Sequence, residues 1–185
     1  MKLCVTCLFF VILISCNRAG KKEVRKVDEG LKMGLPKNVV TDGAIQIGVY
    51  DFEGLEPLLN RKNGKTYVVN FWATWCKPCV AELPYFERLG EKYKDSGVEV
   101  VLVSLDMPGT LDKKLLPFVK REALTSRVVV LDDPRQNDWI PKVAEEWSGA
   151  IPATLIYNKD RRAFYESSLT YTELEENLNA LTDTK

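Results

Sequence analysis

An apolar run that leads directly into a cysteine pair does most to limit how this chain can fold. Residues 66–72 are almost continuously apolar, as in a central strand that is covered on both faces of its sheet. Cys76 and Cys79 follow at once, and apolar residues then recur at helical spacing over residues 78–94. A strand, a short turn and a helix in this order predict a sheet with helices packed against it.

The remaining hydrophobic pattern extends this arrangement along the chain. Strands and helices alternate, and a hairpin with its turn at residues 158–160 precedes a last helix. The expected strands are 44–50, 98–105, 128–131, 153–157 and 162–166, and the expected helices are 52–59, 112–121, 138–147 and 172–181. We therefore predict an α/β domain with a central mixed sheet and helices on both faces.

The charged residues argue against two common classes of function. Lys and Arg together number 26, Asp and Glu also number 26, and histidine is absent, so the formal net charge is zero. A neutral chain has no broad positive field for nucleic acid, so no nucleic-acid partner is expected. A chain without histidine also lacks the usual near-neutral general base and most zinc ligands. The chemistry is expected to depend on cysteine, carboxylates, lysine or tyrosine.

The motif Cys-Lys-Pro-Cys stands at the start of the helix predicted after the apolar strand. The unpaired amides and partial positive charge of a helix N-terminus favour a thiolate, which is the nucleophilic form of cysteine. We assign attack on a substrate disulfide to Cys76 and resolution of the mixed disulfide to Cys79. Lys77 either adds a positive charge beside the attacking sulfur or is simply solvated. Pro78 fits a first helical turn because it needs no amide partner there.

A cysteine pair of this spacing also occurs in zinc sites and in inert structural disulfides. A zinc site needs two more soft ligands, but the chain has no histidine, and its other three cysteines lie within residues 4–16, which are expected to be a cleaved signal and a lipidation site. An inert structural disulfide that closes so short a loop would add little stability. We therefore predict a redox-active pair, no bound metal and no separate cofactor, because the two sulfurs themselves hold the electrons.

The first residues predict export. An apolar run over residues 3–14 is too short to span about 30 Å of hydrocarbon, and it ends in Leu-Ile-Ser-Cys at Cys16. This tetrad is similar to the lipobox of bacterial lipoproteins, which implies cleavage before Cys16 and a lipid on that residue; an ordinary signal peptide is the alternative. The predicted organisation is a signal at 1–15, a lipidated tether at 16–38 and one domain at 39–185.

The segment around the cysteine pair resembles a known active site. Residues 68–79, Val-Val-Asn-Phe-Trp-Ala-Thr-Trp-Cys-Lys-Pro-Cys, and Glu-Leu-Pro at 82–84 are similar to thioredoxin-fold proteins, and more narrowly to the TlpA/ResA-like thiol:disulfide oxidoreductases. The resemblance covers roughly residues 39–181. It implies a thioredoxin fold with an N-terminal extension and an added strand and helix between about residues 111 and 132.

The resemblance also implies roles outside the cysteine motif. Pro152 is similar to the cis-proline of the family, and Ile151 before it is expected to offer its backbone to the substrate. Where thioredoxin has a buried acid, this chain has Asn70, and the family has a partly buried acid near the cysteines. We place that acid at Glu82, one helical turn after Cys79. Burial would raise the pKa of its carboxyl, which could then accept the proton of Cys79.

Other side chains near the motif have more ordinary expectations. Trp72 is expected in the core, Trp75 over the disulfide, and Trp139 and Trp147 in the packing of the later helix. Pro84 is expected to bend the active-site helix. Three acids at strand ends are expected to be caps or solvated turn residues, namely Asp106, Asp132 and Asp133.

These inferences predict a lipid-anchored reductase of the cell envelope that faces the periplasm. Its expected partners are disulfide-containing extracytoplasmic proteins and a membrane thiol protein that donates electrons. Substrate contacts are expected from Trp75, Lys77, Pro78, Ile151 and Pro152. Two alternatives stay open: the pair acts as a disulfide oxidase or isomerase, because direction depends on reduction potential, or the groove beside Pro152 binds a partner and the cysteine pair is structural.

Overall fold

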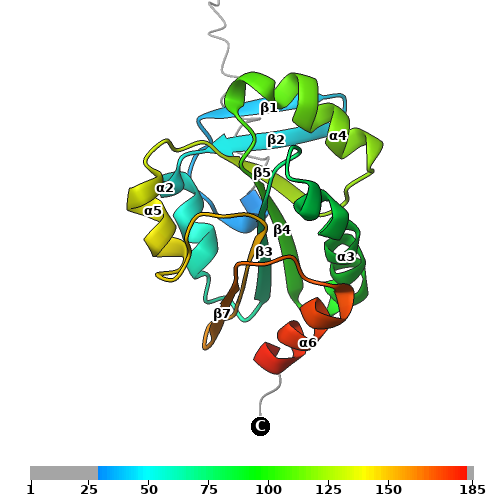
Figure 1. The fold of residues 1–185 in the computed structure, drawn as a ribbon, viewed down its shortest axis with the longest axis vertical. Helices are drawn as coiled ribbons and strands as arrows, with labels where there is room; N and C mark the ends of the chain where they lie inside the picture. Colours follow the sequence, from blue (N-terminus) through cyan, green and yellow to red (C-terminus); the bar gives the residue numbers. More distant parts are fainter. Residues whose placement is uncertain (1–28, 183–185) are drawn as a thin grey trace, which may run out of the picture.

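One mixed sheet of seven strands organises residues 29–182, the part of the chain that this structure, a computed structural model, describes (Figure 1). The strands are β1 (Asn38–Asp42), β2 (Ile45–Tyr50), β3 (Thr66–Trp72), β4 (Val98–Ser104), β5 (Arg127–Leu131), β6 (Ala153–Tyr157) and β7 (Arg162–Tyr165). Their order across the sheet is β1-β2-β5-β4-β3-β6-β7. The four central strands from β2 to β3 are parallel, whereas the β1–β2, β3–β6 and β6–β7 pairs are antiparallel.

Helices cover both faces of this sheet (Figure 1). They are α2 (Phe52–Leu55), α3 (Lys77–Tyr93), α4 (Leu116–Arg121), α5 (Gln136–Val143) and α6 (Tyr171–Thr182), with shorter helical turns at η1 (Glu29–Leu31), η2 (Glu56–Asn60), η3 (Lys94–Ser96), η4 (Pro108–Thr110) and η5 (Leu111–Leu115). The predicted α/β architecture is thereby confirmed. Between residues 111 and 132 the chain forms η5, α4 and β5, which supply the added helix and strand.

The central strand β3 divides the hydrophobic core into two layers. All seven of its residues are buried, as its apolar run predicted. Side chains alternate between the two faces of a strand, so Val68 and Trp72 pack with α3, α4 and α6, whereas Tyr67 and Phe71 pack with α2 and α5. Because β3 is held on both faces and by both neighbouring strands, the residues that follow its end are fixed in position.

The folded domain begins earlier than the predicted boundary after residue 38. That boundary falls within β1, a strand absent from the predicted elements, which pairs with β2 through a turn at Gly43. Leu31 is only 1% exposed and belongs to the core layer beside α2 and α5. The Gly34 amide donates to the Gly54 carbonyl over 2.8 Å, and a Cβ at Gly34 would lie 2.8 Å from Gly54 Cα. The segment from Leu31 onward is therefore part of the domain.

The helix predicted at 138–147 ends earlier, at Val143. Pro141 lies inside α5 and removes one amide donor, and Ala144 leaves the helical conformation with φ −155° and ψ 133°. Trp147 therefore lies beyond the helix, where its indole N–H donates to the Ala150 carbonyl over 2.8 Å. The packing role predicted for Trp139 and Trp147 is confirmed, since both are nearly buried.

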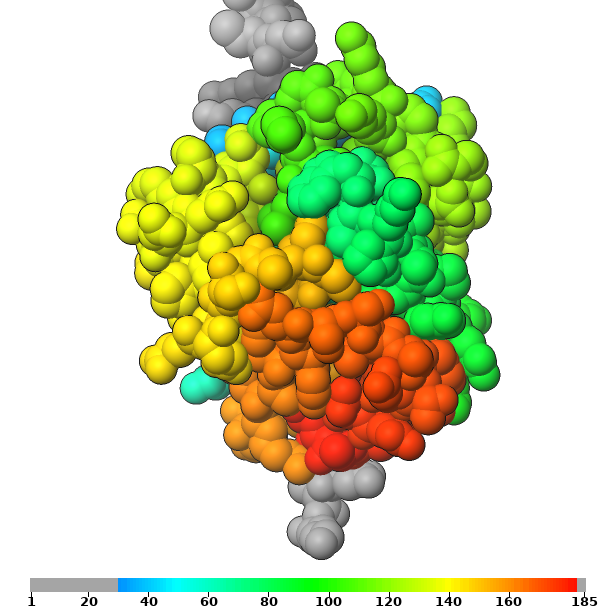
Figure 2. All heavy atoms as spheres, in the orientation of Figure 1, coloured from blue at the N-terminus to red at the C-terminus, as the bar shows by residue number. Residues whose placement is uncertain are grey.

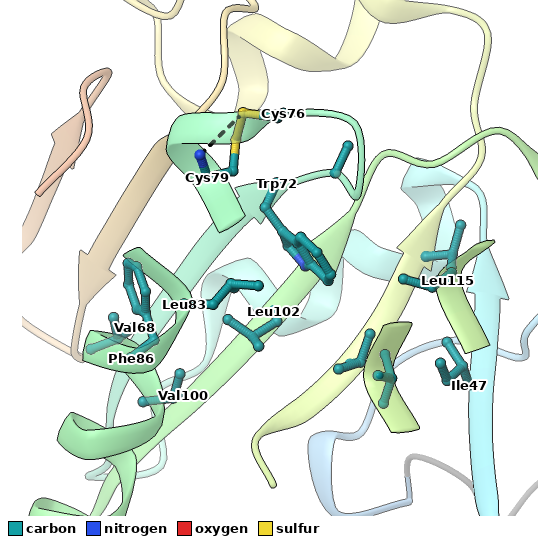
Figure 3. Close-up of a cluster of buried hydrophobic side chains, with 14 of the residues drawn as sticks. Ile47, Val68, Trp72, Cys76, Cys79, Leu83, Phe86, Val100, Leu102 and Leu115 are labelled. Carbon is teal, nitrogen blue, oxygen red and sulfur yellow. Dashed lines mark hydrogen bonds between the residues drawn. A yellow bond between two sulfur atoms is a disulfide. The ribbon is translucent and has the colours of Figure 1, made fainter. Parts of the chain in front are cut away.

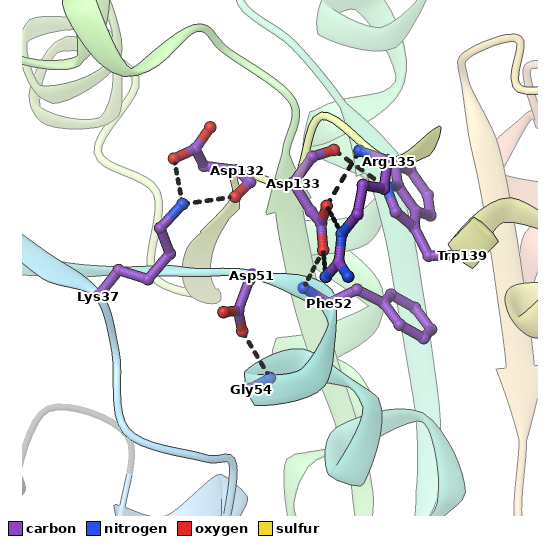
Figure 4. A network of polar contacts seen from close by, with 8 residues as sticks. All are labelled: Lys37, Asp51, Phe52, Gly54, Asp132, Asp133, Arg135 and Trp139. Atoms are coloured by element: carbon purple, nitrogen blue, oxygen red, sulfur yellow. Dashed lines mark hydrogen bonds and ion pairs between the residues drawn. The ribbon is translucent and has the colours of Figure 1, made fainter. Parts of the chain in front are cut away.

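A polar network joins the ends of β2 and β5 (Figure 4). Asp133 accepts a hydrogen bond from the Phe52 amide, the first of α2, over 3.2 Å, so it serves as a cap as expected. It is buried and not solvated, and its hydrogen bond from Arg135 lowers its pKa to about 2. Asp132 pairs with Lys37 at 2.7 Å, which ties the segment before β1 to β5.

The predicted export elements lie outside the described residues. The structure describes neither residues 1–28 nor residues 183–185. The first range contains the predicted signal at 1–15, Cys16 and most of the predicted tether. In residues 29–182 no helix has the length and apolar character needed to cross a membrane.

Candidate active site

The cysteine pair lies where β3 has ended and α3 begins (Figure 3). Cys76 is the residue immediately before the helix, and its Sγ accepts a hydrogen bond from the Cys79 amide over 3.3 Å. The two cysteines form a disulfide with their Cα atoms 5.3 Å apart. The sequence prediction that the pair stands at a helix N-terminus is confirmed. A 17-residue helix therefore directs its unpaired amides and partial positive charge at the Cys76 sulfur.

The two sulfurs differ in their access to solvent. Cys76 is 6% exposed, whereas Cys79 is fully buried and packs in the same core layer as Leu83. Lys77 and Pro78, which separate the cysteines, are both exposed. A molecule that approaches from solvent therefore reaches Cys76 and not Cys79.

A loop from the other side of the sheet covers the Cys76 sulfur. The Ile151–Pro152 peptide bond is cis, as predicted from the resemblance. Phe71 pairs with Ala153 in the antiparallel β3–β6 ladder, so this loop ends at the edge of the sheet from which the cysteine motif emerges. The Ile151 carbonyl oxygen lies 3.8 Å from Cys76 Sγ. The Cys76 sulfur and the Ile151 backbone therefore lie side by side.

Glu82 is buried beneath the cysteines, at 1% exposure, one turn along α3. Its Oε1 accepts a hydrogen bond from Asn70 Nδ2 over 3.0 Å. Its Oε2 accepts from the Ser168 hydroxyl over 3.0 Å and from the Leu169 amide over 2.8 Å. Asn70 also donates to Thr154 Oγ1 over 3.2 Å. Strand β3, helix α3 and the segment before α6 thus meet at one carboxyl, and β6 is joined to it through Asn70.

Burial decides the proton affinity of this carboxyl. Desolvation raises the pKa of Glu82 above its usual value, and the hydrogen bonds from Leu169, Ser168 and Asn70 oppose the rise. A buried carboxyl with a raised pKa binds a proton more readily than an exposed one, which suits it to exchange a proton with a neighbouring thiol. Among residues 29–182 no three cysteine, aspartate or glutamate side chains are grouped as a metal site would require.

Comparison with known proteins decides the family. Residues 40–162 match the family model described as the AhpC/TSA family. This chain belongs to the AhpC/TSA family. Thiol-disulfide oxidoreductase ResA of a Bacillus cereus strain is 31% identical over 151 residues, which cover 81% of this chain and 79% of the relative. The chain is accordingly a thiol-disulfide oxidoreductase of the thioredoxin superfamily.

Solved structures agree on the fold of this AhpC/TSA-family protein. A secreted thiol-disulfide isomerase from Corynebacterium glutamicum aligns with a TM-score of 0.54 at 18% identity, over 75% of this chain and 77% of that one. A secreted Mycobacterium tuberculosis disulfide oxidoreductase, described as homologous to E. coli DsbE, aligns with a TM-score of 0.51 at 22% identity, over 83% and 99%. At these identities the likeness establishes the thioredoxin fold alone.

The tryptophans of this oxidoreductase divide as expected between core and surface. Trp72 is fully buried, and its ring centroid lies 5.4 Å from that of Phe118. Trp75 is 60% exposed beside Cys76, so its predicted contact with substrate stays a prediction. Pro84 lies within α3, which continues beyond it to Tyr93.

Asp106 has a role at the site that the sequence did not indicate. It is buried, at 2% exposure, where a solvated turn residue was one of the expectations. Its carboxylate accepts hydrogen bonds from the Thr74 amide over 2.9 Å, the Thr74 hydroxyl over 2.6 Å and the Ser104 hydroxyl over 2.9 Å. Asp106 therefore fixes the turn two residues before Cys76. Its position two residues after the buried strand β4 was the available signal.

Glu166 is a second residue of this AhpC/TSA-family site that sequence reasoning missed. Its carboxylate accepts hydrogen bonds from the Ser148 amide over 3.1 Å, the Ala150 amide over 3.0 Å and the Ser148 hydroxyl. It thus holds the loop that precedes Ile151. No local pattern signals such a contact, because the partners lie in separate segments joined only by the fold.

Proposed function

We propose that this chain is a membrane-tethered protein-disulfide reductase that acts outside the membrane through Cys76 and Cys79. The observation that supports it best is the placement of the Cys76 sulfur at the N-terminus of α3 and 3.8 Å from the Ile151 carbonyl. The relatives named thiol-disulfide oxidoreductase support disulfides as the substrate class. The resemblance to TlpA/ResA-like proteins supports the reducing direction and the tether.

The first step is attack by Cys76. In the reduced protein its thiolate, stabilised by the N-terminus of α3, attacks one sulfur of the partner disulfide. A bond forms between Cys76 Sγ and that sulfur, the partner S–S bond breaks, and the second partner sulfur leaves as a thiolate that takes up a proton. The Ile151 backbone and the exposed Trp75, Lys77 and Pro78 contact the partner during this step.

The second step is resolution by Cys79. Glu82 accepts the proton of the Cys79 thiol, and the resulting thiolate attacks Cys76 Sγ. The Cys76–Cys79 disulfide forms, the mixed disulfide breaks, and the partner leaves with both sulfurs reduced. Two electrons have moved from the cysteine pair to the partner. A thiol protein in the membrane then reduces the pair again.

The equilibrium reduction potential of the pair tests the direction. A value near that of thioredoxin, about −270 mV, or lower supports the reductase. A value near that of the oxidant DsbA, about −120 mV, contradicts it and favours the oxidase. Cys79→Ser is expected to accumulate disulfide-linked partners through Cys76, whereas Cys76→Ser is expected to accumulate none. Equal capture by both variants contradicts the assignment of attack to Cys76.

The tether is tested separately from the chemistry. We propose that residues 1–15 are removed and that Cys16 carries the lipid that holds the domain at the envelope. Cys16→Ser is expected to move the protein from the membrane fraction to the soluble fraction while the purified protein keeps the wild-type potential. Membrane association that survives this substitution contradicts the lipid anchor.

A further inference from the structure

The segment that joins β7 to α6, residues 166–170, contacts both functional parts of the site. In Figure 2 this orange segment borders the gold loop that leads to Pro152 and the green helix α3. One of its residues, Glu166, binds the loop. Two others, Ser168 and Leu169, bind the carboxyl of Glu82. We call residues 166–170 the connector.

Glu166 holds the loop at two neighbouring amides. Its Oε2 accepts from the Ser148 amide and its Oε1 from the Ala150 amide, on either side of Gly149, whose φ is +94°. The Ser148 hydroxyl donates to Oε1 as well. The Ser148 hydroxyl, together with the Ser148 and Ala150 amides, lowers the pKa of Glu166, so the carboxylate is charged at neutral pH and binds the amides strongly. The loop that presents the Ile151 carbonyl is thereby fixed.

Ser168 holds the proton acceptor. Its hydroxyl donates to Glu82 Oε2, the oxygen that also accepts from the Leu169 amide. The groups that face Glu82 are uncharged: Asn70 from β3 and these two from the connector. On its own helix the titratable residues one turn away are Cys79 before it and Tyr85 after it. A hydrogen bond to the ionised form favours that form, so the Ser168 hydroxyl opposes the effect of burial on Glu82.

We propose that the connector positions the two working parts of the site independently, with Glu166 as the positioning residue of the partner-binding loop and Ser168 as the positioning residue of Glu82. The proposal rests on the proposed roles of Ile151 in partner binding and of Glu82 in proton acceptance. It deepens them, because it names which residues outside the motif set the affinity for the partner disulfide and the pH range of resolution.

Two substitutions separate these effects. Glu166→Gln leaves one amide of the loop without a carboxylate oxygen, so KM for insulin, a protein disulfide, is expected to rise about tenfold or more, as for the loss of one hydrogen bond to a charged group. The pH at which the rate of resolution by Cys79 is half its maximum, called the pH midpoint of resolution, is expected to stay at its wild-type value. Glu173→Gln is the matched control, since Glu173 makes similar contacts with Thr170 at the start of α6 but does not reach the loop.

Ser168→Ala is expected to change the pH dependence of resolution and to leave KM unchanged, the reverse of Glu166→Gln. Loss of the hydroxyl raises the proton affinity of Glu82, so the pH midpoint of resolution moves upward while KM for insulin is unchanged. The midpoint is measured in single turnovers of the reduced protein with dithionitrobenzoate, from release of the second thionitrobenzoate. Ser168→Thr, which restores a hydroxyl, is expected to restore the midpoint, and Ser167→Ala on the neighbouring exposed residue is expected to leave it unchanged.

The outcomes distinguish this proposal from the role of Glu82 itself. Glu82→Gln is expected to abolish the pH midpoint, and a midpoint that survives it contradicts the proposed role of Glu82. If Glu82→Gln abolishes the midpoint but Ser168→Ala does not move it, the positioning role of Ser168 is wrong. An unchanged KM in Glu166→Gln overturns the role of Glu166. Variants that each change KM and the midpoint together, with a lowered Tm, show a merely structural connector.

Discussion

Asn70 donates a hydrogen bond from Nδ2 to Oε1 of Glu82 over 3.0 Å, and both side chains are buried. The resemblance to thioredoxin associates the position of Asn70 with a buried acid. In this chain the strand supplies an amide at that position and the helix supplies the acid. The buried carboxyl is thus kept close to the cysteines, while the element that carries it has changed from β3 to α3.

Asn70→Asp is expected to destabilise the protein increasingly as the pH rises. Two carboxyls would then face each other across about 3 Å, and like charges so close cannot both ionise. Asn70 Oδ1 has no hydrogen-bond partner among the described residues, so no donor is in place for a second carboxylate oxygen. We expect a loss of about 2 kcal/mol or more in the free energy of unfolding at pH 8 and a smaller loss at pH 5. Urea unfolding at pH 5 and pH 8 measures this loss in the free energy of unfolding.

The matched control is Asn137→Asp, which places the same charge change on an exposed side chain. It is expected to change the free energy of unfolding by less than about 0.5 kcal/mol. A loss in Asn70→Asp that is the same at pH 5 and pH 8 contradicts the explanation by carboxyl repulsion.

Glu82→Gln is expected to remove part of the pH dependence of stability. Burial raises the pKa of Glu82 in the folded state, so folding favours its protonated form. Stability from this group is fully present below the unfolded pKa, about 4.3, and is lost as the pH rises through the higher folded pKa. The variant lacks this loss, so its stability relative to the wild type is expected to increase with pH. Parallel stability curves from pH 4 to pH 8 contradict the raised pKa.

Asp106→Ala is expected to loosen the turn before the cysteines. The substitution leaves the Thr74 amide and two hydroxyls without their acceptor, which costs about 1–3 kcal/mol for an unsatisfied buried group. The reaction of Cys76 with dithionitrobenzoate is expected to slow as well, because Thr74 lies two residues before it. Asp112→Ala, on an exposed acid, is the control. Unchanged stability and rate contradict a role for Asp106 in the turn.

Leu31→Ala tests whether the segment before β1 belongs to the domain. Leu31 is 1% exposed, and truncation of a buried leucine costs about 2–5 kcal/mol. Leu35→Ala is the matched control in the same segment, because Leu35 is 65% exposed and its loss is expected to cost less than about 0.5 kcal/mol. Equal free energies of unfolding for the two variants would contradict this assignment and place Leu31 in the tether.

Local pattern predicted the elements whose sequence directly reflects their burial. The strand β3 is buried on both faces, and α3 has one apolar stripe, so both were visible as periodicities. The strand β1 lies at the edge of the sheet and buries only Val40, which leaves little apolar pattern to detect. The end of α5 was misplaced because Trp147 is buried by contacts with distant rings, including Phe71 and Phe164, and not by helical spacing.

The residues of the site also divide into those with a signal in the sequence and those without one. Cys76 and Cys79 were predicted from their motif, Pro152 from the family resemblance, and Glu82 from that resemblance together with its spacing of one helical turn after Cys79. Its partners Ser168 and Leu169 are 86 and 87 residues away along the chain. Such contacts exist only once α6 has packed against α3, so single-sequence reasoning had no signal for them.

The unequal burial of the two sulfurs limits how the chain can be inhibited. Cys79 is fully buried and Cys76 is 6% exposed, so in the proposed mechanism every exchange with another molecule enters and leaves through Cys76. By microscopic reversibility, reduction and oxidation of a partner share the same Cys76-linked intermediate. A compound that caps the Cys76 sulfur therefore stops the chain in either direction, whatever its potential. Such a compound has to fit beside the start of α3 and the Ile151 carbonyl, which lies 3.8 Å from Cys76 Sγ.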